Sequence, residues 1–334
     1  MELNVTAKTN EYPIIIKDSF DGLPEAFERV GLTGRKLCII SDSNVAPLYL
    51  DTIKGILEGR FLKVVGYTFQ AGENSKNLGV INDFYDFFIK EQLDRRSVLV
   101  ALGGGVVGDM TGFAAATYMR GIPFVQVPTT LLAQVDSSVG GKTGVDYKGN
   151  KNMVGAFYQP HFVYINTSTL KTLPKREFSA GMAEAVKHGY IIDREYLKYI
   201  MENRAAISAL EHDAMAKVVY GSCKCKACVV DRDEKESGLR EILNFGHTFG
   251  HAVETLSDFK LIHGECVAIG MAAGLYFSMK RGTITEEDLR MAEELMTYFN
   301  LPVRAEGFNV DDIFKQMFYD KKTKDGKLNW QCLY

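Results

Sequence analysis

Short apolar runs alternate with helical patterns in the first half of the chain. Residues 36–41, 61–69, 97–102 and 124–127 have the length and composition of buried strands. Residues 76–90 repeat their apolar positions with the period of a helix instead. Because strands and helices follow one another in this way, the pattern predicts a parallel sheet with helices on both faces.

The pattern changes after residue 173. From 175 to 318 helical periodicity dominates, and β-branched runs are few. Pro174 marks the predicted boundary, because proline begins a helix well and continues a strand badly. A length of 334 residues also corresponds to about two domains. We therefore expect an α/β N-terminal domain at 1–173, with a parallel-type Rossmann-like sheet, and an all-α C-terminal domain at 174–334. A cleft between two such domains is the expected ligand site.

Composition narrows the class of protein. Thirty-nine basic and 42 acidic side chains leave a net charge of −3, so the chain has no global attraction to nucleic acid. No apolar run reaches the roughly 18 residues of a membrane span, and the N-terminus lacks a signal-peptide pattern. Six cysteines in this length indicate reduced thiols rather than a disulfide framework. We expect a cytoplasmic protein without a nucleic-acid or membrane partner.

A glycine-rich segment follows the third predicted strand. Residues 103–109 read GGGVVGD and open a predicted helix. Backbone N–H groups in such a turn can approach a phosphate, and a helix N-terminus favours negative charge. The glycine spacing differs from the Rossmann fingerprint, and no P-loop lysine follows. The segment therefore predicts phosphate or dinucleotide binding, with a tight turn that holds no ligand as the alternative.

A second polar segment contains lysines among glycines and hydroxyls. Thr129 and Thr130 follow a predicted strand, and residues 136–144 read DSSVGGKTG. Lys148 and Lys151 come shortly afterwards. Cations in this setting favour a concave anion site, and a solvated loop is the alternative.

Histidines and one glutamate indicate a metal site. His247 and His251 lie four residues apart, so they share a helix face and their spacing favours a joint chelate. His263 follows in the segment HGE. Glu184 and Lys187 lie three apart among apolar neighbours, which predicts a largely buried helix where a charge needs a partner. Buried core histidines and a surface ion pair are the respective alternatives.

Three cysteines lie close together at 223, 225 and 228. On a helix Cys225 and Cys228 would share a face, and Cys223 would point elsewhere. No fourth ligand of the zinc-ribbon type follows, so a structural role is favoured over zinc binding. The neighbouring lysines, Lys224 and Lys226, would make these thiols somewhat reactive.

Together these motifs resemble 3-dehydroquinate synthases, of the sugar-phosphate cyclase family, over nearly the whole chain. The matching segments are GGGVVGDMTGFAAATYMRGI, VPTTLLAQVDSSVGGKTGVD, KNMVGAFYQP, GMAEAVKHG, GLREILNFGHTFGHAVE and HGECVAIGM. The resemblance implies a homodimeric phosphate lyase that binds NAD and a divalent metal, usually Zn²⁺, with Co²⁺ possible. Its small-molecule substrate would be 3-deoxy-D-arabino-heptulosonate 7-phosphate, a phosphorylated seven-carbon sugar acid. Its products would be 3-dehydroquinate and phosphate, in the shikimate pathway of aromatic amino-acid biosynthesis.

The resemblance also implies a role for individual residues. It assigns the metal to Glu184, His247 and His263, and so replaces the chelate expected from spacing. The implied NAD-binding residues are Asp42, Asn44, Glu73, Lys76, Gly104, Gly105, Val106, Val107, Gly108, Asp109, Thr129, Thr130, Lys142, Lys151, Thr169, Leu170, Lys171, Thr172 and Leu173. The implied substrate-binding and catalytic residues are Arg120, Asp136, Lys142, Asn152, Lys187, Lys226, Arg240, Asn244 and His251.

The chemistry implied by the resemblance is transient oxidation by NAD, phosphate elimination, re-reduction, ring opening and intramolecular aldol closure. Related cyclases act on substrates without a carboxylate, and they are expected to lose part of the set that holds it. Here Lys226, Arg240, Asn244 and His251 are all present, which favours the dehydroquinate reaction. The alternatives are another sugar-phosphate cyclase, a metal-dependent polyol dehydrogenase, or a non-catalytic paralogue.

Two departures from the family pattern stand out. Ala71 lies where a polar residue or proline is more usual, but the Gly72–Glu73 turn remains. The family also continues beyond the position of Tyr334, and its C-terminal substrate lysine corresponds to Lys321 or Lys322. A shorter end would weaken closure over the substrate.

Overall fold

The computed structural model describes residues 1–258 and 260–318. The chain forms two compact units. The first comprises residues 1–173 and 215–235, and the second comprises 174–214 together with the described residues from 236 onward. Lys321 and Lys322, either of which was expected to be the C-terminal substrate lysine, lie outside the described residues.

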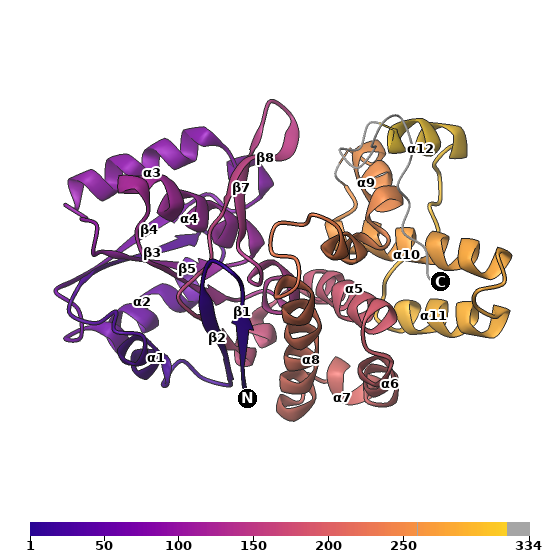
Figure 1. Ribbon diagram of the computed structural model, residues 1–334, viewed down its shortest axis with the longest axis horizontal. Coiled ribbons are helices and arrows are strands. Elements are labelled where there is room, and N and C mark those ends of the chain that lie inside the picture. Colours follow the sequence, from indigo (N-terminus) through magenta and orange to yellow (C-terminus); the bar gives the residue numbers. More distant parts are fainter. Residues whose placement is uncertain (259, 319–334) are drawn as a thin grey trace. The chain divides into compact units, whose positions relative to one another are not determined.

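The first unit is built on a seven-stranded sheet in the order β1-β2-β9-β6-β5-β3-β4 (Figure 1). All neighbouring strands are parallel except β1 and β2, which are antiparallel, so the predicted parallel-type sheet is confirmed. The strands are β1 (Glu2–Thr6), β2 (Glu11–Lys17), β3 (Lys36–Asp42), β4 (Lys63–Phe69), β5 (Val98–Gly103), β6 (Phe124–Pro128) and β9 (Val163–Asn166).

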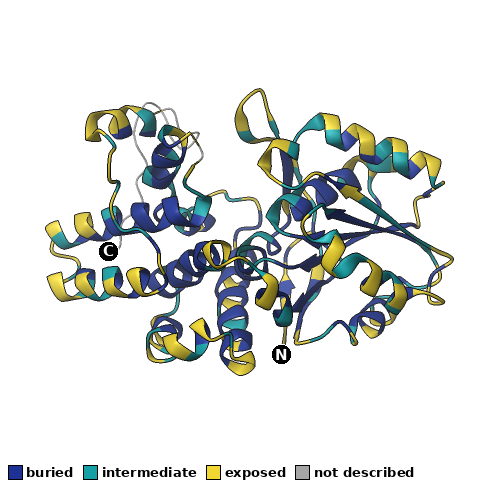
Figure 2. Cartoon of the chain, turned by 180° about the vertical axis from the view of Figure 1, so that it is seen from behind, coloured by how far each residue is buried: buried dark blue, intermediate teal, exposed yellow. Residues whose placement is uncertain are grey.

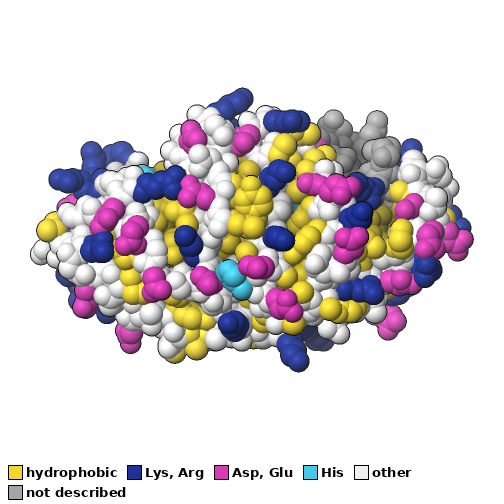
Figure 3. Space-filling view, turned by 90° about the horizontal axis from the view of Figure 1, so that it is seen from below, with side chains coloured by type: hydrophobic (Ala, Val, Ile, Leu, Met, Phe, Trp, Pro, Cys, Tyr) yellow, Lys and Arg dark blue, Asp and Glu magenta, His cyan; other side chains and the backbone are white. Residues whose placement is uncertain are grey.

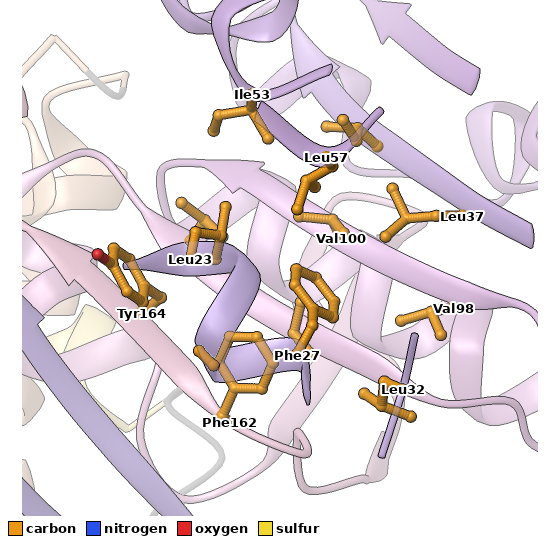
Figure 4. Packing of buried hydrophobic residues seen from close by; sticks show 14 of the residues in the cluster. Leu23, Phe27, Leu32, Leu37, Ile53, Leu57, Val98, Val100, Phe162 and Tyr164 are labelled. Carbon is orange, nitrogen blue, oxygen red and sulfur yellow. The ribbon is translucent and has the colours of Figure 1, made fainter. Parts of the chain in front are cut away.

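Helices cover both faces of this sheet, because β5 is buried at every position and β3 is buried from Leu37 to Ser41. Leu37 and Val100 face a core shared with α1 (Leu23–Arg29) and α2 (Ala46–Leu57), as Figure 4 shows. Their neighbours in sequence face a second core under α3 (Leu78–Lys90) and α4 (Gly105–Thr117). Continuous apolar strands are the pattern of a parallel sheet buried on both faces, and Figure 2 shows these strands as buried.

The lysine-containing segment that follows Thr130 forms an antiparallel ribbon. It is therefore not only a solvated loop, which was the alternative expected from the sequence. Strand β7 (Lys142–Tyr147) pairs with β8 (Asn150–Phe157). Gly144 and Gly155 lie opposite each other, and a Cβ at Gly155 would come 2.2 Å from the carbonyl oxygen of Thr143. Close backbone approach therefore explains part of the glycine content of this segment.

Residues 215–235 were expected in the second domain, at 174–334. In the structure they group with the first unit instead. They hold most of α8 (His212–Val230) and the turn after it. The thiol of Cys223 contacts the carbonyl oxygen of Gln134 at 3.2 Å. Beyond the helix, Gln159 Nε2 donates to Glu234 Oε1 at 2.9 Å. These polar contacts join a segment of helical sequence to the α/β unit.

Among its described residues, the second unit contains helices and no strand, as the sequence predicts. Helix α10 packs against α5, α9 and α11. A Cβ at Gly270 in α10 would lie 1.9 Å from the carbonyl oxygen of Gly246, so only glycine permits this crossing with α9. The helices are α5 (Lys175–Ile191), α6 (Arg194–Glu202), α7 (Arg204–Ser208), α9 (His247–Leu256), α10 (His263–Lys280), α11 (Glu286–Tyr298) and α12 (Val310–Met317).

The surface carries both signs of charge. On the face in Figure 3, Lys and Arg side chains are interspersed with Asp and Glu. That face offers no extended basic field of the kind that binds nucleic acid. Within the described residues, no helix has the length and apolar character needed to cross a membrane.

Candidate functional site

The glycine-rich turn brings several predicted cofactor residues together at the carboxyl edge of the sheet. Strand β5 ends at Gly103, and α4 begins at Gly105. Thr129 N donates to the carbonyl oxygen of Gly103 at 3.0 Å, and a Cβ at Gly104 would lie 3.0 Å from Thr130 Cγ2. The predicted strand–turn–helix is confirmed, and its free helix N-terminus suits an anionic group.

Other glycines of the same motif serve packing instead. A Cβ at Gly108 would lie 2.7 Å from Gln126 Oε1, and one at Gly112 would lie 2.4 Å from Thr143 Cγ2. These positions let α4 approach β6 and β7 closely. Some of these glycines are therefore needed for helix packing rather than for approach to a ligand.

Lys76 links three segments with predicted binding roles. Its buried ammonium donates to Asp109 Oδ2 at 2.7 Å and to Asn152 Oδ1 at 2.6 Å, and lies 3.9 Å from Glu73. Burial alone lowers the pKa of Lys76, but the carboxylates of Asp109 and Glu73 outweigh it and hold that pKa above its ordinary value. Lys76 therefore stays charged and ties α4 to the β7–β8 ribbon.

The β7–β8 ribbon carries the predicted phosphate-binding groups. Lys142 and Asn152 are exposed, and Lys151 is half-buried. Asn152 has φ of 52° and donates its N–H to Asp146 Oδ1 at 2.7 Å, which fixes the backbone near the ribbon tip. The ribbon thus presents cationic and amide groups on a fixed backbone.

Asp42 and the segment 169–173 are held by contacts within the unit. Asp42 Oδ1 accepts from Asn44 N at 2.8 Å and Val45 N at 3.0 Å, forming an Asx turn at the end of β3. The Thr169 hydroxyl is buried in contact with Gln134 Nε2, and Leu170 lies in the core. Cofactor contacts for this segment remain a prediction, and Thr169 and Leu170 have evident structural roles.

Two predicted substrate groups pair with each other in the first unit. Lys226 Nζ lies 2.7 Å from Asp136 Oδ1 and donates to the Asp136 carbonyl oxygen at 2.7 Å. Arg120, in contrast, is exposed after the far end of α4, whose 13 residues span about 20 Å. Arg120 also has φ of 69°, a strained backbone for a residue of this type. The structure therefore does not bring Arg120 to the glycine-rich turn.

A possible metal-binding triad lies in the second unit. Glu184 comes from α5, His247 begins α9, and His263 begins α10. One ligand atom from each lies within 4.8 Å of the others. Glu184 Oε1 is 3.8 Å from His247 Nε2 and 3.4 Å from His263 Nε2. Two imidazoles and one carboxylate fit a catalytic zinc site, which keeps a position open for substrate.

Neighbouring groups orient the triad. His247 Nδ1 lies 3.2 Å from the carbonyl oxygen of Phe245. A proton on Nδ1 would leave the lone pair of Nε2 facing Glu184. Lys187 forms an ion pair with Glu184, and both side chains are buried. The alternative of a surface ion pair at 184 and 187 is therefore wrong.

His251 lies beside this triad. Its ring centroid is 5.4 Å from that of His247 and 6.1 Å from that of His263. It belongs to a second group of possible ligands with Glu254 and His263. Among the described residues, no such group contains both His247 and His251, so the chelate expected from spacing is not supported. Sequence reasoning missed Glu254, although its place at i+3 from His251 was a usable signal.

Arg240 and Asn244 lie in a 3-10 segment, Leu239–Asn244. Arg240 is only 1% exposed, so its guanidinium does not lie on a solvated face. Asn244 Nδ2 donates to Glu236 Oε1 at 2.9 Å. A buried guanidinium beside an oriented amide is suited to recognising an anionic substrate group.

The three cysteines lie on α8, as expected for a helical segment. Cys223 and Cys225 are buried, whereas Cys228 is exposed. Burial raises the pKa of Cys223 to about 12, which makes this thiol unreactive despite the nearby lysines. Within the described part of the chain, no possible ligand group includes a cysteine.

Replacing Cys223, Cys225 and Cys228 with alanine is therefore expected to leave metal content unchanged. Elemental analysis of the purified protein should give about one ion per chain for both forms, because one catalytic triad holds one ion. A wild-type content near two that falls to one in the variant would instead identify a cysteine site.

Comparisons with known proteins agree with this geometry. The family model for the N-terminal part of 3-dehydroquinate synthase matches residues 66–180, and the model for its C-terminal part matches 181–323. The 3-dehydroquinate synthase of Acetivibrio thermocellus is 47% identical, over 99% of this chain and 91% of that protein. The enzyme of Symbiobacterium thermophilum is 49% identical, over 89% and 83%. The chain belongs to the 3-dehydroquinate synthase family.

Solved structures of related cyclases have the same fold. The 2-epi-5-epi-valiolone synthase of Streptomyces hygroscopicus, described with NAD⁺ and Zn²⁺ bound, has a TM-score of 0.88 at 26% identity, over 96% of this chain and 89% of that one. A 2-deoxy-scyllo-inosose synthase, at 24% identity over 100% and 94%, has a TM-score of 0.86. A glycerol dehydrogenase of Schizosaccharomyces pombe shares the fold at 16% identity, with a TM-score of 0.68 over 91% and 81%.

Proposed function

We propose that this chain is a 3-dehydroquinate synthase that converts 3-deoxy-D-arabino-heptulosonate 7-phosphate to 3-dehydroquinate and phosphate. The observation that carries the proposal is the difference in similarity between the two kinds of cyclase. Identity to the named 3-dehydroquinate synthases is 47–49%, against 24–26% for the valiolone and inosose synthases. The groups suited to a carboxylate and a phosphate are also present in this chain.

The proposed cofactors are NAD and a divalent metal, with Zn²⁺ favoured and Co²⁺ as an alternative. Glu184, His247 and His263 would hold the metal, because they form a two-histidine, one-carboxylate set. The turn at Gly104–Gly105 and the charged pair Lys76–Asp109 would hold NAD. When bound, these groups would supply a hydride acceptor and donor and a Lewis acid for a substrate hydroxyl.

The chain's own side chains would bind and orient the substrate. Lys142, Lys151 and Asn152 of the ribbon would hold the phosphate, which carries negative charge as it leaves. The buried Arg240 would pair with the substrate carboxylate through two parallel N–H donors. His251 would move a proton at a substrate oxygen through a ring nitrogen.

The proposed function is tested by counting phosphate per NAD. The full chain is incubated with heptulosonate phosphate, zinc and NAD at a concentration far below that of the substrate, and released phosphate is measured. Because the hydride returns within one turnover, phosphate should exceed NAD many-fold while absorbance from NADH stays flat. Phosphate limited to one equivalent per NAD, with NADH accumulating, would identify an enzyme with net redox, such as a polyol dehydrogenase.

Arg240→Lys is expected to lower kcat/KM for this substrate. Lysine keeps the charge but cannot reproduce the planar pair of donors. The expected loss is about 1.5–3 kcal/mol of transition-state binding, the scale of a hydrogen bond to a charged group. Unfolding of the free variant is the control. Full activity with an earlier melting transition would assign Arg240 to the fold rather than to the substrate.

We also propose a homodimer that works in the cytoplasm. Both statements extend the family resemblance to this chain. Light scattering coupled to size-exclusion chromatography measures the assembly, and a monomer mass at micromolar concentration would contradict the dimer. Cell fractionation measures the location.

A further inference from the structure

One face of α5 aligns with the first turn of α10. Arg176, Ala180 and Glu184 follow one another at four-residue spacing, so they share this face. Their partners are three consecutive residues, in reverse order along the chain. Arg176 Nη2 lies 2.6 Å from Glu265 Oε2, a Cβ at Gly264 would lie 2.2 Å from the Ala180 carbonyl oxygen, and Glu184 lies 3.4 Å from His263.

The contact between Arg176 and Glu265 is bidentate. Arg176 Nε donates to Glu265 Oε1 at 2.7 Å, in addition to the Nη2 bond, and Nη2 also donates to the Lys260 carbonyl oxygen at 2.7 Å. Glu265 Oε2 accepts a third bond from Ile262 N at 3.0 Å, which caps the first turn of α10. One carboxylate therefore fixes the start of α10 and joins it to α5.

We propose that Arg176 and Glu265 are positioning residues that hold His263 at metal-binding distance from Glu184, and so set the affinity of the triad for its divalent ion. His263 is the first residue of α10, where a helix has no hydrogen-bonded turn before it to fix its position. Neither Arg176 nor Glu265 is a ligand. They act on the two helices that supply two of the three ligands. The inference rests on the metal site of the proposed function.

An ordinary surface ion pair contributes little to the stability of a protein. This pair differs, because the Glu265 side chain is only 11% exposed and accepts three donors. The chain also offers a matched control. Arg290 on α11 donates to Glu287 and Glu294, all three more than half exposed, and none of these residues belongs to a possible metal-ligand group among the described residues.

The test compares Arg176→Gln, Glu265→Gln, the double variant and the control Arg290→Gln in the metal-free full chain. Zinc affinity is measured by competition with a chromogenic chelator, and the visible spectrum of the Co²⁺-loaded protein reports ligand geometry. Both single variants should bind zinc roughly tenfold more weakly, the lower end of the effect of groups that orient ligands. The double variant should be little worse than either single one, because both remove the same contact.

Arg176→Lys should recover part of the affinity, since lysine keeps one charged hydrogen bond. The metal-free variants should melt somewhat earlier than Arg290→Gln, because Glu265 is largely buried, so the Co²⁺ spectrum separates ligand positioning from stability. The inference is overturned if Arg176→Gln binds zinc with the wild-type affinity and gives the same Co²⁺ spectrum as the wild type. It is also overturned if the affinity loss matches that of Arg290→Gln. A wild-type protein that binds zinc but releases no phosphate would contradict the proposed function alone.

Discussion

Replacing Glu184 with alanine is expected to remove both the metal and the activity. Glu184 is the carboxylate of the possible triad and lies at the centre of α5, in contact with Lys187 and close to two histidines. Without it, two imidazoles from different helices remain, which is too few ligands for a catalytic zinc site. A Lewis-acid metal contributes several kcal/mol, so kcat should fall on the order of 10³-fold. His247→Ala and His263→Ala should behave in the same way.

His251→Ala is the control for this experiment. It should keep the metal while activity falls on the order of 10²–10⁴-fold, the usual contribution of a proton-transfer group. Metal content is measured by elemental analysis, and the free energy of unfolding of each metal-free variant is measured separately. If His251→Ala and Glu254→Gln lose the ion while Glu184→Ala keeps it, the ion occupies the second ligand group instead.

Gly264→Ala is expected to destabilise the second unit and weaken metal binding together. The added methyl group would meet the backbone carbonyl of Ala180 at 2.2 Å, and a backbone atom cannot turn aside as a side chain can. Helices α5 and α10 would therefore have to separate at this contact. The contact lies between the Arg176–Glu265 ion pair and the Glu184–His263 pair of possible metal ligands, so both pairs would be disturbed. The expected cost is about 1–3 kcal/mol in the free energy of unfolding, typical of overpacking.

Gly55→Ala is the matched substitution. Gly55 lies inside α2, where a Cβ would meet nothing within 4 Å. There alanine should stabilise the protein by roughly 0.5–1 kcal/mol, because it improves helix propensity. Denaturant unfolding of both variants measures the contrast. A Gly264→Ala variant as stable as the wild type would show that the two helices can move apart freely.

The sequence predicts the central strands of the sheet well, because their signal is local. Within the predicted strands, residues 37–40 and 98–102 are uninterrupted apolar runs, and both lie in strands buried on two faces. The β7–β8 ribbon is less visible, because Gly144 and Gly155 have no side chain that would show strand alternation. Strands β1, β2 and β9 were also missed. The pairing of β2 with β9 joins residues about 150 positions apart, as at Ile14 and Val163, which no local pattern records.

The candidate site shows the same limit. Spacing alone favoured His247 with His251, since a linear pattern expresses only relations between residues that are near in sequence, such as an i, i+4 pair. The triad instead draws one residue from each of three helices, and only the family resemblance indicated it. The roles of Arg176 and Gly264 are equally invisible in the sequence, because each depends on a partner in a distant turn.

The grouping of residues 215–235 with the first unit has a consequence for how the protein can be divided. The chain passes between its two compact units three times, after residues 173, 214 and 235. No single break in the gene could release either unit whole. A fragment that ends at residue 173 would leave Gln134 and Asp136 without Cys223 and Lys226. A gene for either unit alone would therefore have to be assembled from two separate segments of this one.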